Sequence, residues 1–400
     1  MTVAFVPYGA YWSTPFVRWQ GALAELHSLR FAAWTATRAL AKRGIDPAVF
    51  DFGVLGMTVP QRGSFYGLPW LMGEIGAAEV GGPTIAQACA TSARCLQVGC
   101  QEVAGGASAS TLVVTADRVS NGPHLYYPAP SATGGTGETE NWVLDNFARD
   151  PFGGVAMVAT AENCAAKWGL SREAQDAVTL QRYAQYADAL ANDSAFHRKF
   201  MDLPFEVPDP KFRKVTATLN GDIGIHATTA EGLAALRPAT EGGTVTFGGQ
   251  THPADGNAGM VVASRDRARE LSRNPEIEVR LTGFGTARVE RAFMPAAPVP
   301  AARRALTAAG LSIGDIDAVK SHNPFAVNDL VFAAETGFPL DRMNNFGCSL
   351  VWGHPQAPTG MRAIIELIEE LSLRGGGRGL FQGCAAGDTA MAVVVEVGDG

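Results

Sequence analysis

The sequence predicts a layered α/β fold made of two similar halves with an inserted region between them. Residues 35–60 resemble residues 301–326, which indicates an internal duplication. Each half also ends in a β-branched strand, at 110–119 and at 391–400, preceded by Gly-rich turns. The segment 121–245 between the halves has a different composition. Strands that alternate with helices in both halves favour mixed sheets buried between helices.

The repeated unit is a helix followed by a strand. Each copy begins with Ala and Leu at three-and-four spacing, which predicts an amphipathic helix. Gly44 of the first copy aligns with Gly310 of the second, and each glycine marks a helix end. Asp51 aligns with Asp317, and an apolar strand follows each aspartate. The chain therefore uses one unit twice.

The domain division follows from this pattern. Residues 1–120 with 246–265 form the predicted N-terminal half, 121–245 the inserted loop domain, and 266–400 the C-terminal half. The inserted region starts with Tyr, Pro, Asn and Gly and contains a predicted helix at 171–196 with Ser171 as its N-cap.

Composition excludes several classes of protein. The chain has 400 residues, 46% of them hydrophobic and 18% charged, which is typical of a globular protein with a large core. No uninterrupted apolar run could span a bilayer, and a net charge of −7 without a Lys/Arg run predicts neither a membrane nor a nucleic-acid partner. The N-terminal residues lack the pattern of a signal peptide, so a cytoplasmic location is expected.

The cysteines predict reduced thiols and no metal site. The six cysteines are too few for a disulfide-stapled scaffold of this length. None of them has C-x-x-C spacing, and the seven histidines do not cluster near them at ligand spacing.

Cys89 is the first candidate catalytic residue. It lies in "IAQACATSARC", where an apolar run meets a predicted helix. The positive end of a helix dipole favours a thiolate, which predicts a reactive nucleophile. Free cysteine is also among the residues most often packed in a core, so a structural role stays open from this segment alone.

Three further segments place polar residues where strands meet turns. "SHNPFAVND" contains His322 and Asn323, "NNFGCSLVWGHPQAPTG" contains His354, and "LFQGCAAGDTAM" contains Cys384. Loops that a rigid sheet presents in this way often carry catalytic residues.

Taken together, these segments resemble the thiolase family over nearly the whole chain. The motifs occur in thiolase order and are "YWSTPF", "GIDPAVFDFGVLGMTVP", the Cys89 segment, "MVATAEN", "LRPATEGGTVTFGGQTHPADGNAG", the "GHP" turn and the Cys384 turn. The resemblance implies a five-layered α/β/α/β/α fold of two halves with a loop domain. It also implies coenzyme A as a substrate, without a metal.

The resemblance also implies roles for individual residues. Cys89 would attack a 3-oxoacyl-CoA and become acylated, His354 would take its proton, and Cys384 would exchange a proton with the α-carbon of the enolate. His322 would hold an oxyanion together with His354, and the backbone N–H groups of Cys89 and Ala386 would hold the acyl oxygen.

Further residues are expected to bind the cofactor or to select the substrate. We expect coenzyme A to lie near Thr251, Gly248 and Asn323. Departures from the family pattern at "HNPF", at "CAAGD" and at Ala156 argue against a short acetoacetyl substrate. A branched, aromatic or dicarboxylic 3-oxoacyl-CoA is expected instead, since the chain is similar to the branch with sterol-carrier-type and benzoylsuccinyl-CoA thiolases. The aromatic start of the inserted region either lines a site for such acyl groups or is an interface loop.

Two alternatives stay open. A condensing enzyme of the ketoacyl-synthase type would share the fold and the nucleophile but would not need Cys384. A thiolase-like subunit could instead serve a complex with a small zinc-ribbon/OB-fold partner, which members of this branch often have. The resemblance implies a homo-oligomer, a dimer or a tetramer. Thiolysis and its reverse, Claisen condensation, would use the same residues.

Overall fold

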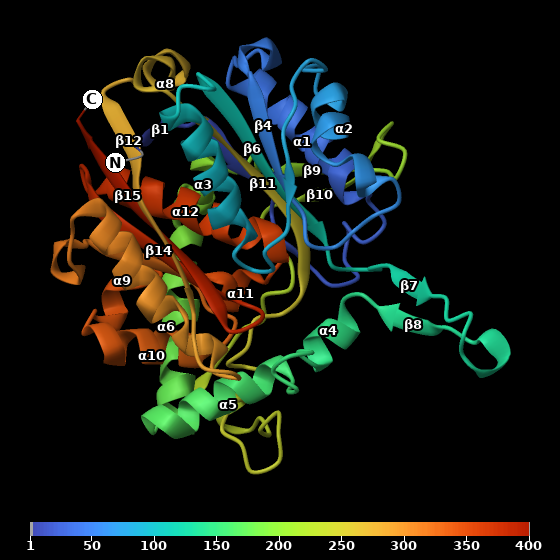
Figure 1. The fold of residues 1–400 in the computed structure, drawn as a ribbon. Coiled ribbons are helices and arrows are strands. Elements are labelled where there is room, and N and C mark those ends of the chain that lie inside the picture. The colour runs from blue at the N-terminus through green and yellow to red at the C-terminus, as the bar shows by residue number, and fades with distance from the viewer. Residues whose placement is uncertain (1–2, 400) are drawn as a thin grey trace.

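The computed structural model describes residues 3–399 and contains one large mixed sheet (Figure 1). Nine strands form its hydrogen-bonded path, and β2 (Tyr11–Ser13) and β3 (Val17–Arg18) pair with one of them, β11, off that path. In spatial order, the path runs through β13 (Ala318–His322), β14 (Gly377–Ala385), β15 (Thr389–Asp399), β12 (Ile277–Arg288), β1 (Ala4–Pro7), β11 (Ala254–Ala263), β6 (Ser110–Arg118), β4 (Phe52–Gly56) and β5 (Thr84–Ile85).

The strand order confirms the duplication. The N-terminal half has the order β1-β11-β6-β4, and the C-terminal half has the matching order β12-β15-β14-β13. In each half the last pair is parallel, β4 with β6 and β13 with β14, and the other neighbours are antiparallel. The antiparallel pair β1·β12 joins the two halves, with Phe5 opposite Arg280.

Helices form three layers around the two halves, as the predicted five-layered fold requires. In the middle layer, α3 (Thr91–Ala104) and α12 (Gln356–Leu373) contact each other and strands of both halves. On the outer faces, α1 (Ser28–Lys42) and α2 (Leu68–Glu74) pack on one side, and α9 (Pro298–Ala309) and α10 (Ala326–Thr336) pack on the other (Figure 1). α8 (Arg265–Leu271) and α11 (Ser349–Trp352) are short connecting helices.

The repeated glycines end equivalent helices. Gly44 follows α1 with φ +67°, and Gly310 follows α9 with φ +73°. Glycine adopts this left-handed conformation without the steric cost of a Cβ atom, so both predicted helix ends are confirmed. The strands predicted after Asp51 and Asp317 are β4 and β13. The late strands are β6 and β15, and residue 400 lies outside the described residues.

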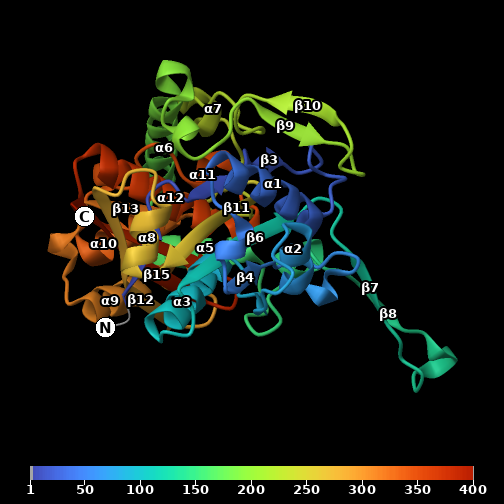
Figure 2. The same cartoon turned by 90° about the horizontal axis from the view of Figure 1, so that it is seen from above.

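The segment 121–245 leaves the core and returns to it. The hairpin of β7 (His124–Tyr127) and β8 (Glu138–Asn141) extends away from the body of the molecule (Figures 1 and 2). The other elements of the segment are α4 (Leu144–Ala148), α5 (Met157–Trp168), α6 (Arg172–Ser194), β9 (Phe205–Pro208), β10 (Val215–Leu219) and α7 (Ala230–Ala234). The predicted long helix is α6, and the Ser171 hydroxyl accepts a hydrogen bond from the Ala174 N–H as its N-cap. The exact domain boundaries stay a prediction.

Connections between these elements contain 3₁₀ turns at Pro47–Val49, Ser64–Tyr66, Thr133–Gly135, His197–Lys199, Met294–Ala296, Ile313–Asp315 and Leu340–Arg342.

Within residues 3–399, no helix is long and apolar enough to cross a membrane. All six cysteines are free, as expected for reduced thiols.

A buried ion pair fastens the inserted region to the middle layer. Arg362 of α12 donates two hydrogen bonds, of 2.6 and 2.8 Å, to Asp222 of the inserted region, and neither side chain is exposed. Asp222 also accepts from the Tyr186 hydroxyl at 2.9 Å and from the Phe16 N–H at 2.7 Å. The Arg362 guanidinium in turn donates to Glu366 at 2.9 Å. The charges are therefore fully hydrogen-bonded, which such deep burial requires.

We predict that Asp222→Ala lowers the free energy of unfolding by about 3–5 kcal/mol, because it leaves the Arg362 charge buried without its main partner. Urea denaturation measures the change. Glu206→Ala, which removes the partner of exposed Arg38, is the matched control and should cost about 0–1 kcal/mol. Equal losses in the two variants would contradict the proposed importance of the buried pair.

Candidate active site

A pocket of about 890 Å³ lies between the inserted region and the core. This volume is in the range of small-molecule sites. Cys89, His354 and Ala386 line it from the core side, and Trp142, Met157 and Tyr183 line it from the inserted region. Among the described residues no carboxylate lines the pocket, whereas Arg18 does. The wall therefore suits an anionic or neutral ligand better than a cationic one.

The backbone before α3 holds Cys89 in a strained turn. Ala88 has φ +44°, a left-handed conformation that non-glycine residues rarely adopt. The turn is fixed by the Thr91 hydroxyl, which donates to the Ala88 carbonyl at 2.7 Å and accepts from the Gln87 N–H at 2.8 Å. Strain of this kind concentrates at functional sites.

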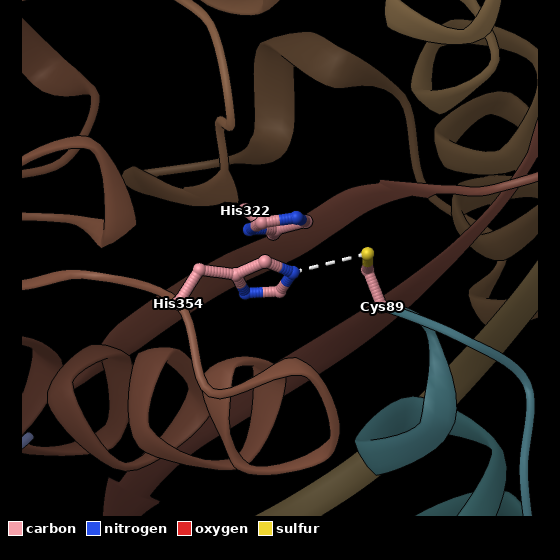
Figure 3. Close-up of side chains that lie close together, drawn as sticks. All are labelled: Cys89, His322 and His354. Carbon is pink, nitrogen blue, oxygen red and sulfur yellow. Dashed lines mark hydrogen bonds between the residues drawn. The ribbon is translucent and has the colours of Figure 1, made fainter. Parts of the chain in front are cut away.

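Cys89 and His354 form a direct pair (Figure 3). The sulfur of Cys89 lies 3.1 Å from Nε2 of His354. On the other side of the ring, Nδ1 of His354 lies 2.7 Å from Oγ1 of Thr359. The Thr359 hydroxyl donates its single proton to the Pro355 carbonyl at 2.6 Å, so it must accept from Nδ1–H. Nε2 of His354 is therefore unprotonated and can accept the proton of the Cys89 thiol.

His322 lies beside this pair, with its ring stacked on that of His354 at 4.0 Å between centroids (Figure 3). Nδ1 of His322 lies 3.0 Å from the Ser349 hydroxyl. Its Nε2 is buried and, among the described residues, has no hydrogen-bond partner. An unpartnered polar atom in a buried position is costly, so Nε2 is available for a ligand atom.

Burial keeps Cys89 and His354 neutral. Loss of solvation raises the pKa of Cys89 to about 12, although the backbone N–H groups of Ala386 and of Cys89 itself act to lower that pKa. Loss of solvation also lowers the pKa of His354 to about 3. The expected stabilisation of the thiolate by the helix dipole is thus outweighed by desolvation. The thiolate forms only when its proton passes to His354.

Cys384 lies at the end of β14, behind the pocket wall. Its sulfur accepts a hydrogen bond from the amide nitrogen of Asn328 at 3.3 Å. Burial and the nearby Cys89 raise the pKa of Cys384 well above its ordinary value. The structure therefore holds Cys384 as a neutral thiol close to Cys89.

The three residues expected to bind the cofactor have different positions. Thr251 lines the pocket, and its hydroxyl donates to the Ser349 carbonyl. Asn323 is fully buried away from the pocket, where it donates to Asp329 at 2.8 Å and to Cys348 at 3.2 Å. Gly248 faces Leu233 and Leu236. Neither Asn323 nor Gly248 is among the described residues that line the pocket, and coenzyme A binding by these two residues stays a prediction.

Sequence reasoning missed the residues that orient the predicted ones. Thr359, Ser349 and Asn328 hydrogen-bond to His354, His322 and Cys384, respectively. Thr359 is five residues after His354, so a hydroxyl in the first turn of the following helix was a usable signal. Ser349 and Asn328 carried no such signal, because 27 and 56 positions separate them from their partners.

A metal ion could also bind in the pocket, where a sulfur and two imidazole rings lie close together. The ligand atoms of Cys89, His322 and His354 lie within 4.8 Å of one another. Sulfur and imidazole are the donors that zinc prefers. The sequence predicts no metal, and that stays a prediction.

Family models match most of the chain. Residues 10–266 match the N-terminal domain of thiolase, and residues 276–397 match its C-terminal domain. Among curated proteins, the acetyl-CoA acetyltransferase of Chromobacterium violaceum is 29% identical over 388 residues, covering 94% of this chain and 95% of the relative. The acetyl-CoA acetyltransferase of Shinella zoogloeoides is 31% identical over 312 residues, covering 78% of each.

Solved structures agree with these matches. Human mitochondrial 3-ketoacyl-CoA thiolase superposes with a TM-score of 0.89 at 27% identity and 98% coverage of both chains. The same human protein in complex with CoA has a TM-score of 0.87 at 26% identity, again with 98% coverage of both chains. The Bacillus anthracis acetyl-CoA acetyltransferase has a TM-score of 0.89 at 25% identity, with 99% coverage of both chains.

We predict that Thr359→Val slows alkylation of Cys89 by iodoacetamide roughly tenfold at neutral pH, because the buried Nδ1–H of His354 loses its acceptor. Intact-mass kinetics measure the rate. Thr359→Ser keeps the hydroxyl and should restore most of it. An equally slow Thr359→Ser variant would show that packing, and not the hydrogen bond, matters at this position.

The neutral pair also predicts an unusual pH profile. Between about pH 5 and pH 9, proton transfer from Cys89 to His354 does not change the total number of bound protons, so the alkylation rate should be nearly constant. In His354→Ala the Cys89 thiol must lose its proton to solvent, and throughout this range the pH is below the raised pKa of that thiol. The rate should then rise about tenfold per pH unit. An inflection near neutral pH in the wild type would contradict the raised pKa of Cys89.

Proposed function

Because this chain belongs to the thiolase family and is an acyltransferase, we propose that it transfers an acyl group between Cys89 and coenzyme A, cleaving a 3-oxoacyl-CoA. The observation that carries the proposal is the neutral Cys89–His354 pair, 3.1 Å apart, on the wall of a pocket without carboxylates. The similar human enzyme has been solved with CoA, which supports CoA as the second substrate.

The first half-reaction acylates Cys89 and releases acetyl-CoA. The Cys89 sulfur attacks the 3-oxo carbon while Nε2 of His354 takes the thiol proton. The C2–C3 bond then breaks, and its electrons leave as the enolate of acetyl-CoA. The Cys384 thiol gives its proton to the enolate carbon, which completes acetyl-CoA and leaves an acyl-Cys89 with a Cys384 thiolate.

The second half-reaction restores both thiols. The Cys384 thiolate takes the proton of the incoming CoA thiol, and the CoA sulfur attacks the acyl carbon. The bond to the Cys89 sulfur breaks, and protonated His354 returns the proton to Cys89. Run backwards, the same steps join two acyl-CoA molecules in a Claisen condensation.

Negative charge develops on two oxygens during these steps. The backbone N–H groups of Cys89 and Ala386 act to lower the pKa of the Cys89 thiol, which supports their predicted role around the acyl oxygen. Nε2 of His322 has no partner among the described residues and is the candidate donor to the enolate oxygen. That role requires a proton on Nε2, so the single Ser349 proton must go to Nδ1 of His322 and not to the side-chain oxygen of Asn323, which lies 3.1 Å from the same hydroxyl.

Cys384 favours the thiolase over the ketoacyl-synthase alternative. A proton at the α-carbon must be exchanged in thiolysis, and the Cys384 thiol is close enough for the charge of Cys89 to raise its pKa. Asn328 orients this thiol through its hydrogen bond. A purely structural subunit would not need such an arrangement.

The finer part of the proposal concerns the acyl group, the cellular location and the oligomeric state. Trp19, Trp142 and Phe147 line the pocket and support a bulky acyl group over acetoacetyl. The six free cysteines support a cytoplasmic location. Exposed Phe65 and Tyr66, together with the edge strand β5, support a homo-oligomer. A zinc-ribbon/OB-fold partner stays a prediction.

The roles of the two thiols can be separated by mutation. Cys89→Ala should form no acyl-enzyme with any thioester. Cys384→Ala should still be acylated at Cys89 by acyl-CoA, though more slowly, because CoA can leave as a thiolate without the Cys384 proton. It should lose about 10²–10⁴-fold in cleavage of a 3-oxoacyl-CoA, because a leaving enolate carbon needs that proton more. Intact mass and product formation measure the two steps. Normal turnover in either variant would refute the assigned role.

A further inference from the structure

Besides other polar side chains such as those of Asn146, Gln250 and Thr251, the pocket wall carries a polar spot next to Trp142. It consists of the Thr58 hydroxyl and the Gln356 side-chain amide, whose Oγ1 and Oε1 atoms lie 3.0 Å apart. Gln356 follows His354 by two residues and begins α12. The spot therefore lies on the same wall as the catalytic pair.

The buried carboxylate behind this spot fixes where the Thr58 proton goes. Oδ1 of Asp117 accepts from the N–H groups of Thr58 at 2.8 Å and Val59 at 3.0 Å. Oδ2 accepts from the Ala357 N–H at 2.7 Å and from the Thr58 hydroxyl at 2.6 Å. Three backbone N–H groups donate to Asp117, and burial raises the pKa of its carboxyl group only to about 6, so at neutral pH the ionised Asp117 accepts the single Thr58 proton.

This proton assignment orients the Gln356 amide. Two oxygens without a shared proton repel at 3.0 Å, and the two ends of a glutamine amide are assigned from the surrounding hydrogen bonds. The consistent arrangement has the Gln356 amide nitrogen donating to Oγ1 of Thr58. The carbonyl oxygen of Gln356 then faces the pocket as an acceptor.

The surroundings of this acceptor are aromatic and rigid. Trp142 donates from its indole nitrogen to the Thr58 carbonyl at 2.9 Å. Trp19 and Phe147 pack in the same cluster as Trp142, around Val59 and Val143. A ring-sized group can therefore contact these side chains while one polar substituent reaches Gln356.

We propose that the acyl group of the substrate is bulky and uncharged and carries a hydroxyl group that donates a hydrogen bond to the side-chain oxygen of Gln356. This inference rests on the proposed function and narrows its substrate class. The alternative with a carboxylate on the acyl group is disfavoured, because that group would meet a carbonyl oxygen with the Asp117 carboxylate behind it.

The test compares acylation of Cys89 by three classes of acyl-CoA thioester of nearly equal size. They are cyclohexanecarbonyl-CoA and its 3- or 4-hydroxy and 3- or 4-oxo derivatives. Rapid-quench intact mass gives the apparent second-order rate of acyl-enzyme formation. In the wild type, a hydroxy derivative should react roughly three- to tenfold faster than the other two classes, the usual effect of one neutral hydrogen bond.

Three variants locate the effect. Gln356→Leu removes the acceptor and should bring the hydroxy preference to about one. Gln356→Asn keeps the amide on a shorter side chain and should retain part of the preference. Gln250→Leu is the matched control, since Gln250 lines the same pocket next to Thr251, and it should leave the ratio between thioesters as in the wild type.

Each contrary outcome has a distinct meaning. A preference for the oxo derivative would show that the amide presents its N–H, and an unchanged ratio in Gln356→Leu would exclude Gln356. Equal slowing of all thioesters in Gln356→Leu, with the ratio kept, would place Gln356 against coenzyme A instead. Each of these outcomes would overturn the inference about the acyl group and leave the proposed function in place. No Cys89 adduct from any thioester, acetyl-CoA included, would overturn the proposed function itself.

Discussion

The ion pair between Asp222 and Arg362 is the interaction on which the arrangement of the site depends. It joins the inserted region to α12, and α12 begins directly after the turn that holds His354. Both charged groups are buried away from water, so each needs hydrogen-bond partners in suitable positions. The pocket forms between the two parts that this pair holds together, and the position of one catalytic group is thereby tied to the wall that faces it.

Desolvation determines the chemistry of the catalytic groups. Cys89 and His354 are both neutral because burial penalises each charged form, and the raised pKa of Cys384 has the same main cause. In the proposed mechanism the nucleophile is generated by proton transfer within the pair, at the moment when substrate supplies a carbon to attack. The backbone N–H groups of Cys89 and Ala386 act to lower the pKa of the Cys89 thiol, and the proposed mechanism assigns to them the charge that develops on the acyl oxygen.

The two halves and the inserted region contribute different functions. The N-terminal half supplies Cys89 from the start of α3, and the C-terminal half supplies His322, His354 and Cys384. The inserted region supplies Trp142, Met157 and Tyr183 to the pocket wall. Gln356, the proposed contact of the acyl group, belongs instead to the C-terminal half and follows His354 by two residues, so the proposed reaction and substrate selection share that half.

The sequence by itself determined the duplicated unit and its helix ends, and it predicted Cys89 and His354 as a catalytic pair, which the fold brings into contact. Gly44, Gly310 and Ser171 act through their own backbone or their nearest neighbours, so their roles are visible in a short window of sequence. Only the tertiary structure decided the protonation of Cys89 and His354, the exclusion of Asn323 from the pocket, and the orientation of Gln356. The Cys89–His354 and Thr58–Gln356 contacts span 265 and 298 positions of the chain, and desolvation depends on everything packed around a group. No local pattern of residues encodes such quantities.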